Sequence, residues 1–149
     1  MSHSVPVHEG PAPAWLDRVI AAAAVGVAAW IVWRLAPLAP DPRGFGTHEA
    51  LGWTPCSWPT SYGIPCPTCG ATTAACLLVH LRPLDALLAH PFGAVLTVLT
   101  FVVAALGLHD LLRGRAFLVR AYSIKLAPWV VGGVVLLGAS WLYKWLTWE

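Results

Sequence analysis

The chain has 149 residues, of which 58% are hydrophobic and only 11% are charged. An average soluble domain is about 45–50% hydrophobic and about 25% charged, so this composition excludes a disordered chain and argues against a water-soluble globule. The formal net charge of +2 is too small for the basic face of a nucleic-acid-binding protein. Composition therefore predicts an integral membrane protein with the lipid bilayer, and no nucleic acid, as its partner.

Three long apolar segments follow a proline-rich tail. Residues 1–14 show no apolar period and predict a disordered tail. About 20 helical residues cross the hydrocarbon core of a bilayer. The runs at about 16–38, 92–112 and 126–148 meet that length. The sequence therefore predicts one membrane domain over 15–149, an all-α integral membrane protein with three transmembrane helices.

Orientation follows from the positive charges in the short loops. The loop between the second and third spans carries Arg113, Arg115, Arg120 and Lys125. The stretch 39–65 carries Arg43 alone. Because basic loops stay in the cytoplasm, we expect a cytoplasmic N-terminus and an outward-facing 39–65 loop, in a bacterial inner membrane.

The segment between the first two clear spans contains a polar interruption. Leucines recur at helical spacing over 69–89, but Pro83 breaks the pattern and Arg82 and Asp85 add charges that cost about 3 kcal/mol each at membrane depth. We therefore expect a short re-entrant or interfacial helix pair within 39–90; a fourth span is the alternative. The candidate polar patch at membrane depth comprises His80, Arg82, Asp85 and His90. In the simpler interpretation, Asp85 pairs locally with Arg82.

Three cysteines lie in a stiff, aromatic segment after the first span. Cys56 precedes the C-x-x-C pair Cys66 and Cys69, and four prolines lie between 55 and 67. Pro67 suits the first position of a helix, which predicts Cys66 as its N-cap. A sulfur there faces unpaired N–H groups, so we expect a lowered Cys66 pKa. Cys76 lies about 10 Å further along that helix and is expected to be a small buried residue.

Three interpretations of these cysteines remain open. A structural disulfide would join Cys56 to Cys66 or Cys69 in an accessory subunit or homo-oligomer, and this interpretation is favoured. A thiol–disulfide oxidoreductase would use Cys66 as the attacking thiolate, Cys69 as the resolving thiol and Cys56 as a relay beside a quinone. A metal site would bind zinc or another ion through Cys56, Cys66 and Cys69, with Cys76 or a histidine considered as a further ligand. Whether the protein is an enzyme is left open.

The cysteine motif also resembles that of a known family. The run Cys66-Pro-Thr-Cys69-Gly70-Ala-Thr72, followed by His90-Pro91 at the head of a span, is similar to a bacterial domain-of-unknown-function family of small, mostly three-span membrane proteins. That family is marked by C-P-x-C-G-x-T-R, and the resemblance covers about residues 48–112. It implies no activity, but it implies a hallmark site of Cys56, Cys66, Cys69, Gly70 and Thr72. Thr73 stands where many members carry arginine.

Overall fold

Every element that the computed structural model describes is helical, and it describes residues 14–115, 117 and 126–148. Three helices are long and apolar enough to cross a membrane: α1 (Ala14–Leu35), α5 (Pro91–Arg113) and α7 (Leu126–Leu146). This confirms the predicted all-α class with three candidate spans. The predicted tail, apart from its last residue, lies outside the described residues, as do Arg120 and Lys125.

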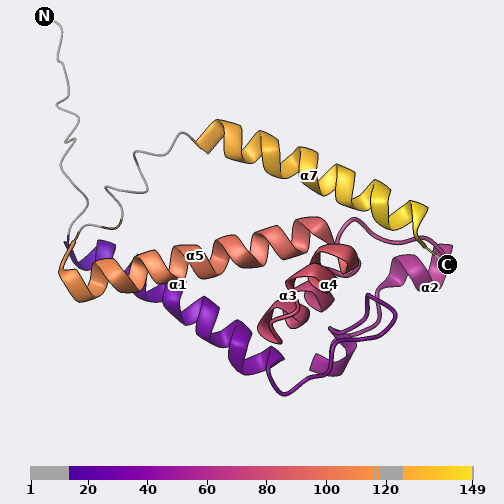
Figure 1. Cartoon of the computed structure of the whole chain (residues 1–149), viewed down its shortest axis with the longest axis horizontal. Helices are drawn as coiled ribbons and strands as arrows, with labels where there is room; N and C mark the ends of the chain where they lie inside the picture. Colours follow the sequence, from indigo (N-terminus) through magenta and orange to yellow (C-terminus); the bar gives the residue numbers. More distant parts are fainter. Residues whose placement is uncertain (1–13, 116, 118–125, 149) are drawn as a thin grey trace, which may run out of the picture.

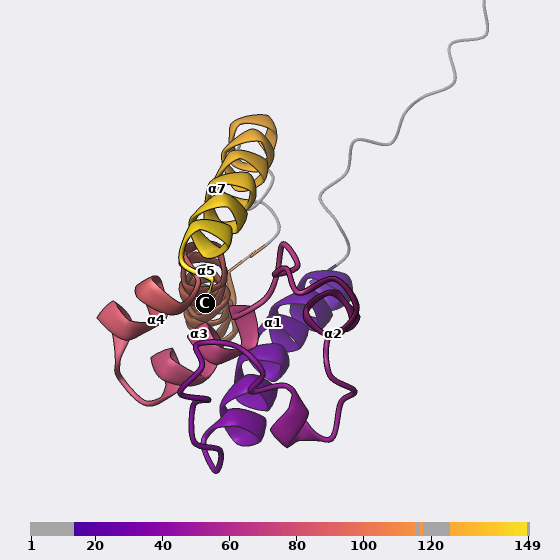
Figure 2. The same cartoon turned by 90° about the vertical axis from the view of Figure 1, so that its right-hand side faces the viewer.

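The first two spans form the main helix pair of the molecule. α1 and α5 lie side by side, and α7 runs along the other side of α5 (Figure 1). Viewed nearly along α5, α7 and α1 lie on different sides of it (Figure 2). Gly107 permits the close approach of α1 and α5, because a Cβ at this position would lie 3.2 Å from the Ala21 carbonyl oxygen. At this end of the pair, the Phe117 N–H donates to the buried Asp17 carboxylate over 3.0 Å.

Four short helices gather at the other end, where α1 stops and α5 starts. They are η1 (Glu49–Leu51), α2 (Ser57–Tyr62), α3 (Ala71–Val79) and α4 (Pro83–Ala89). α3 and α4 are the predicted short helix pair, and with nine and seven residues neither is long enough to cross a bilayer. A small apolar core lies among α3, α4 and the start of α5, formed by Ala74, Leu77, Ala86, Ala89 and Ala94. The turn that carries Cys66 and Cys69 leads through Gly70 directly into α3.

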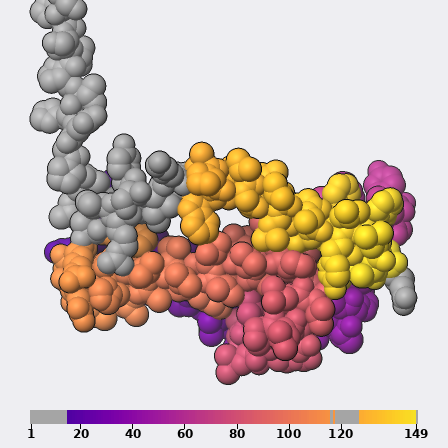
Figure 3. Space-filling model, turned by 45° about the horizontal axis from the view of Figure 1, so that its top comes forward, coloured from indigo at the N-terminus to yellow at the C-terminus, as the bar shows by residue number. Residues whose placement is uncertain are grey.

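α7 docks onto the rest of the molecule through its C-terminal turns. Within the described residues, its hydrogen bonds to other elements all come from residues 140–144. Trp141 Nε1 donates to the Pro65 carbonyl and the Tyr143 hydroxyl donates to the Leu88 carbonyl, both over 3.0 Å. Toward its other end α7 stands away from α5 (Figure 3). The end of α7 is thus fixed to the same loops that carry the cysteines.

Candidate metal centre

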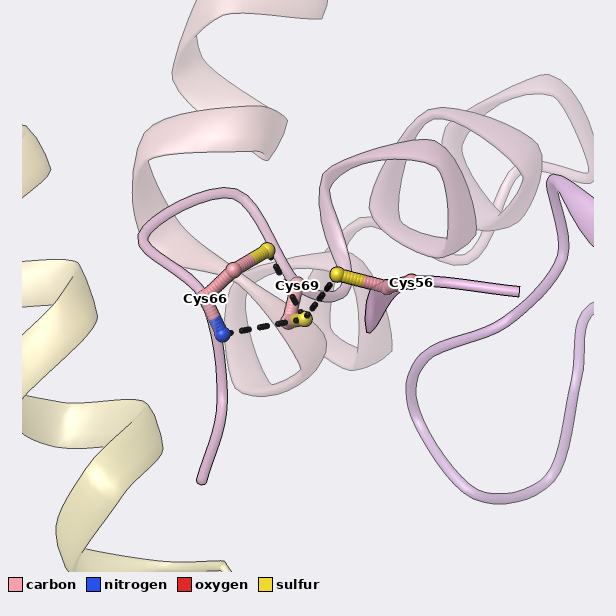
Figure 4. A group of neighbouring side chains, drawn as sticks. All are labelled: Cys56, Cys66 and Cys69. Atoms are coloured by element: carbon pink, nitrogen blue, oxygen red, sulfur yellow. Dashed lines mark hydrogen bonds between the residues drawn. The ribbon is translucent and has the colours of Figure 1, made fainter. Parts of the chain in front are cut away.

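Three cysteine sulfurs converge at the end of the molecule where the short helices gather. The Sγ atoms of Cys56, Cys66 and Cys69 lie within 4.8 Å of one another (Figure 4). Cys69 lies between the other two, 2.9 Å from Cys66 Sγ and 3.8 Å from Cys56 Sγ. All three are free thiols in the structure, as is Cys76. The predicted disulfide is therefore absent from the structure.

A tight turn places Cys66 and Cys69 together. The Cys69 N–H donates to the Cys66 carbonyl over 3.0 Å, and the Cys66 N–H donates back to Cys69 Sγ over 3.2 Å. Gly70 then adopts a φ of +102° and is the N-cap of α3. The prediction that Cys66 caps this helix is wrong, because the left-handed backbone at Gly70 separates the turn from the helix. Cys56 reaches the cluster from the N-cap position of α2.

The two sulfurs of the C-x-x-C pair have opposite electrostatic environments. Burial raises the pKa of the Cys66 thiol, but hydrogen bonds from Cys69 and Thr68 lower it more, so its pKa lies below the ordinary value. Burial and then the hydrogen bond with Cys66 raise the pKa of Cys69 above the ordinary value. The lowered Cys66 pKa was predicted from the dipole of a helix, whereas its cause is neighbouring side chains. The pair therefore contains one sulfur that ionises readily and one that holds its proton.

Gly70 is required where it stands because the site is packed tightly behind it. A Cβ at Gly70 would lie 2.8 Å from the Gly44 carbonyl oxygen and 3.0 Å from that of Ala89. Lys144 of α7 donates to the same two carbonyls, over 3.1 Å and 3.5 Å. A buried ammonium group thus lies behind the residue that follows Cys69.

The residues of the predicted polar patch have separate partners. The side chains of Arg82 and Asp85 pair with each other over 2.7 Å at the surface, as the simpler interpretation holds. His80 Nε2 bonds with the Leu38 carbonyl over 2.8 Å. His90, which is fully buried, accepts from the Gly93 N–H through Nδ1 and donates from Nε2 to the Pro67 carbonyl. Of this set, His90 is the residue that contacts the cysteine turn.

A cavity of about 210 Å³ opens directly onto the sulfurs. Besides the three cysteines, its walls include Thr72 of the predicted hallmark set and two residues that the sequence did not single out for the site, His48 and Thr73. Thr73, which is 1% exposed, bonds to the buried Thr47 hydroxyl over 2.8 Å. Cys76 lies elsewhere, buried against the carbonyls of Leu35 and Leu38.

Sequence reasoning missed Thr47 and Lys144 as residues that organise this end of the molecule. Lys144 stands near the end of an apolar segment, where a lysine ordinarily extends to the membrane surface. Thr47 lies in a polar loop without a motif. The signal in the sequence was weak for both residues. Lys144 is a charge within an apolar span, and Thr47 is a second threonine that could pair with Thr73.

Comparison with known proteins finds similarity to a family without a known function. A family model described as "Protein of unknown function (DUF2752)" matches residues 56–104. The match contains the three cysteines of the cluster, α3, α4 and the first half of α5. No curated protein and no solved structure is significantly similar to the chain.

Proposed function

We propose that the protein is a metal-binding membrane protein that holds a soft divalent ion, Zn²⁺ in the first instance, through Cys56, Cys66 and Cys69. The observation that carries this proposal is the convergence of three thiol sulfurs within 4.8 Å from two separate loops. Thiolate sulfur is a preferred ligand of Zn²⁺, and three thiolates with one further ligand make a common structural site.

The spacing of the sulfurs suits an ion of this size. With Zn–S bonds of about 2.3 Å, two ligands of a tetrahedral zinc site lie about 3.8 Å apart. The sulfurs of Cys56 and Cys69 have that separation, at 3.8 Å. The 2.9 Å between Cys66 and Cys69 would have to widen by about 0.9 Å, a change within reach of a side-chain rotation because Cys66 is not fully buried. The adjustment that the ion requires of the C-x-x-C pair is thus a rotation of the Cys66 side chain.

The electrostatics of the site also favour a bound cation with thiolate ligands. Three thiolates around Zn²⁺ leave a net charge of −1. The buried Lys144 ammonium bonds to the carbonyl oxygens of Gly44 and Ala89, directly behind the glycine that follows Cys69. A buried cation is less costly when an anionic group lies nearby. The loaded site supplies that negative charge.

The test is the metal content of the purified protein. The full chain is purified in detergent without chelators, and zinc per protein is measured by inductively coupled plasma mass spectrometry. We expect about one ion per chain, and a stoichiometry near zero in Cys56→Ser and Cys69→Ser. Cys76→Ala is the matched control because that thiol lies outside the cluster. The proposal would be overturned if wild-type protein contained no metal after incubation with Zn²⁺. It would also be overturned if Cys76→Ala lost as much bound zinc as Cys69→Ser.

A second candidate function rests on the opposite pKa shifts of the C-x-x-C pair. A lowered pKa at Cys66 beside a raised pKa at Cys69 is the asymmetry of an attacking thiolate and a resolving thiol. In such an oxidoreductase the pair would cycle between dithiol and disulfide, and its redox state would follow the glutathione potential applied to the membranes. A zinc site would keep both thiols reduced and unreactive until a chelator is added. The described residues lend no support to a quinone, and an accessory role in a larger complex stays a prediction.

A further inference from the structure

We propose that His48 supplies the fourth ligand and completes a Cys3His site; this inference rests on the proposed metal-binding function. Three sulfurs leave one position of a tetrahedral ion open. His48 lines the same 210 Å³ cavity as Cys56, Cys66 and Cys69. Its imidazole is not among the groups gathered within 4.8 Å, so it reaches the ion by turning across the cavity.

The backbone at His48 is held firmly against the site. The preceding residue, Thr47, is 1% exposed. Its hydroxyl bonds with Thr73 of α3 over 2.8 Å and accepts from the Asp41 N–H over 3.1 Å. The His48 carbonyl then accepts from the N–H groups of Leu51 and Trp53, which closes the turn around η1. A histidine whose backbone is fixed and whose side chain can change rotamer is well suited to coordinate an ion in the adjacent cavity.

His48 also differs from the other described histidines in having an uncommitted ring. His80 bonds with Leu38, His90 with Pro67 and Gly93, and His109 with Asp110. Within the described part of the chain, the His48 ring makes no hydrogen bond. Both of its nitrogens are therefore available, one for the ion and one for a second partner.

The carboxylates closest in sequence are already engaged. Asp41 bonds to the Arg43 guanidinium over 2.7 Å, and Glu49 pairs with the same guanidinium over 3.3 Å. Among the described residues that line the cavity, His48 is the one imidazole beside the three thiols. Cys3His is one of the recurrent ligand sets of structural zinc. The loop from His48 to Cys69 would then hold all four ligands, with seven residues between His48 and Cys56 and nine between Cys56 and Cys66.

Cobalt substitution tests the ligand set directly. Co²⁺ is bound to the metal-free full chain in detergent, and its visible absorption is recorded for wild type, His48→Cys, His48→Ala and the control His80→Ala. The d–d bands report the number of sulfur ligands. We expect a three-sulfur, one-nitrogen spectrum in wild type and a shift to longer wavelength in His48→Cys, which would have four sulfurs.

Affinity for Zn²⁺, measured by competition with a chromophoric chelator, provides the second readout. We expect His48→Ala to weaken binding by more than about 10-fold, since even the loss of an outer-shell partner costs about 10–100-fold. His80→Ala should leave both spectrum and affinity unchanged. Stoichiometric Co²⁺ with identical spectra and affinities in wild type and His48→Ala would overturn the assignment of His48 and leave the three-thiol site intact. Failure of wild type to bind either ion would instead overturn the proposed function.

Discussion

Lys144 of α7 donates a hydrogen bond to the carbonyl of Gly44, 100 residues earlier in the chain, over 3.1 Å. Its ammonium group is also within 6.0 Å of the ring centroids of Phe45 and Trp148. The side chain is 7% exposed, so this charge is enclosed by the loop that precedes the cysteines and by the end of the third span. The contact joins the C-terminal span to the candidate metal centre.

We expect Lys144→Met to loosen α7 and to weaken metal binding together. The substitution removes the donor to two carbonyls, and each buried carbonyl left without a partner costs about 1–3 kcal/mol. It also removes the buried positive charge behind Gly70, which would balance the negative charge of the loaded site. The measurements are the thermal unfolding midpoint in detergent and the Zn²⁺ affinity. Trp145→Leu is the control, because Trp145 is 58% exposed on the same helix. An unchanged affinity in a destabilised Lys144→Met protein would show that Lys144 acts on packing alone.

Gly70→Ala should be much more damaging than Gly63→Ala. Both glycines have positive φ, at +102° and +67°, and an L-residue in the left-handed region costs about 1–2 kcal/mol. Gly63 has open space where a Cβ would stand, whereas Gly70 faces a backbone oxygen at 2.8 Å. Overpacking of this kind adds about 1–3 kcal/mol. The unfolding midpoint of Gly70→Ala should therefore lie well below that of Gly63→Ala, and equal midpoints would contradict the packing argument.

The hydroxyl pair of Thr47 and Thr73 should contribute to stability as a unit. Thr73→Val removes one partner of a buried bond while keeping the side-chain shape, and should cost about 1–2 kcal/mol. Thr47→Val and the double variant complete a mutant cycle. A coupling energy indistinguishable from zero would show that the two hydroxyls act independently. Because Thr73 is buried, we also expect Thr73→Arg to prevent folding unless position 47 changes as well.

The alkylation of the two C-x-x-C thiols should respond differently to pH in the reduced, metal-free protein. Because the pKa of Cys66 is lowered, its reactive thiolate persists below the pH at which an ordinary thiol is protonated. The thiolate of Cys69, whose pKa is raised, forms only at higher pH. Rates of iodoacetamide labelling, followed by mass spectrometry at each cysteine, should therefore show an earlier onset for Cys66. In dodecyl sulfate the two profiles should merge, and coincident profiles in the folded protein would refute the asymmetry.

Three spans place the cysteine loops and the end of α7 on the same side of the membrane. The structure agrees with this arrangement, because Trp141 bonds to the Pro65 carbonyl and Lys144 to that of Gly44. From the positive charges of the 113–125 loop we expect that side to be the outside. A reporter fused after Glu149 should read as external, and an impermeant thiol reagent should reach Cys66 in intact cells. A cytoplasmic reading of the reporter would reject the predicted orientation.

The spans and the pairing of Cys66 with Cys69 were predictable because both are encoded locally. Apolar length defines α1, α5 and α7, and a C-x-x-C pair in one turn has to bring its sulfurs near each other. The start of α3 was misplaced because Pro67 suits a tight turn as well as a first helical position, and Gly70 decided between them through its backbone. The Thr47–Thr73 and Lys144–Gly44 contacts join residues 26 and 100 positions apart, and no local pattern encodes such pairs.

The attachment of α7 beside the cysteines has a consequence for biosynthesis. Lys144 is made 75 residues after Cys69. At a synthesis rate of about 5–20 residues per second, the three thiols wait about 4–15 s before the last helix can dock beside them. During that interval the nascent thiols are open to oxidants and to free ions alike. The order in which the segments leave the ribosome thus sets a time limit within which ion capture competes with oxidation.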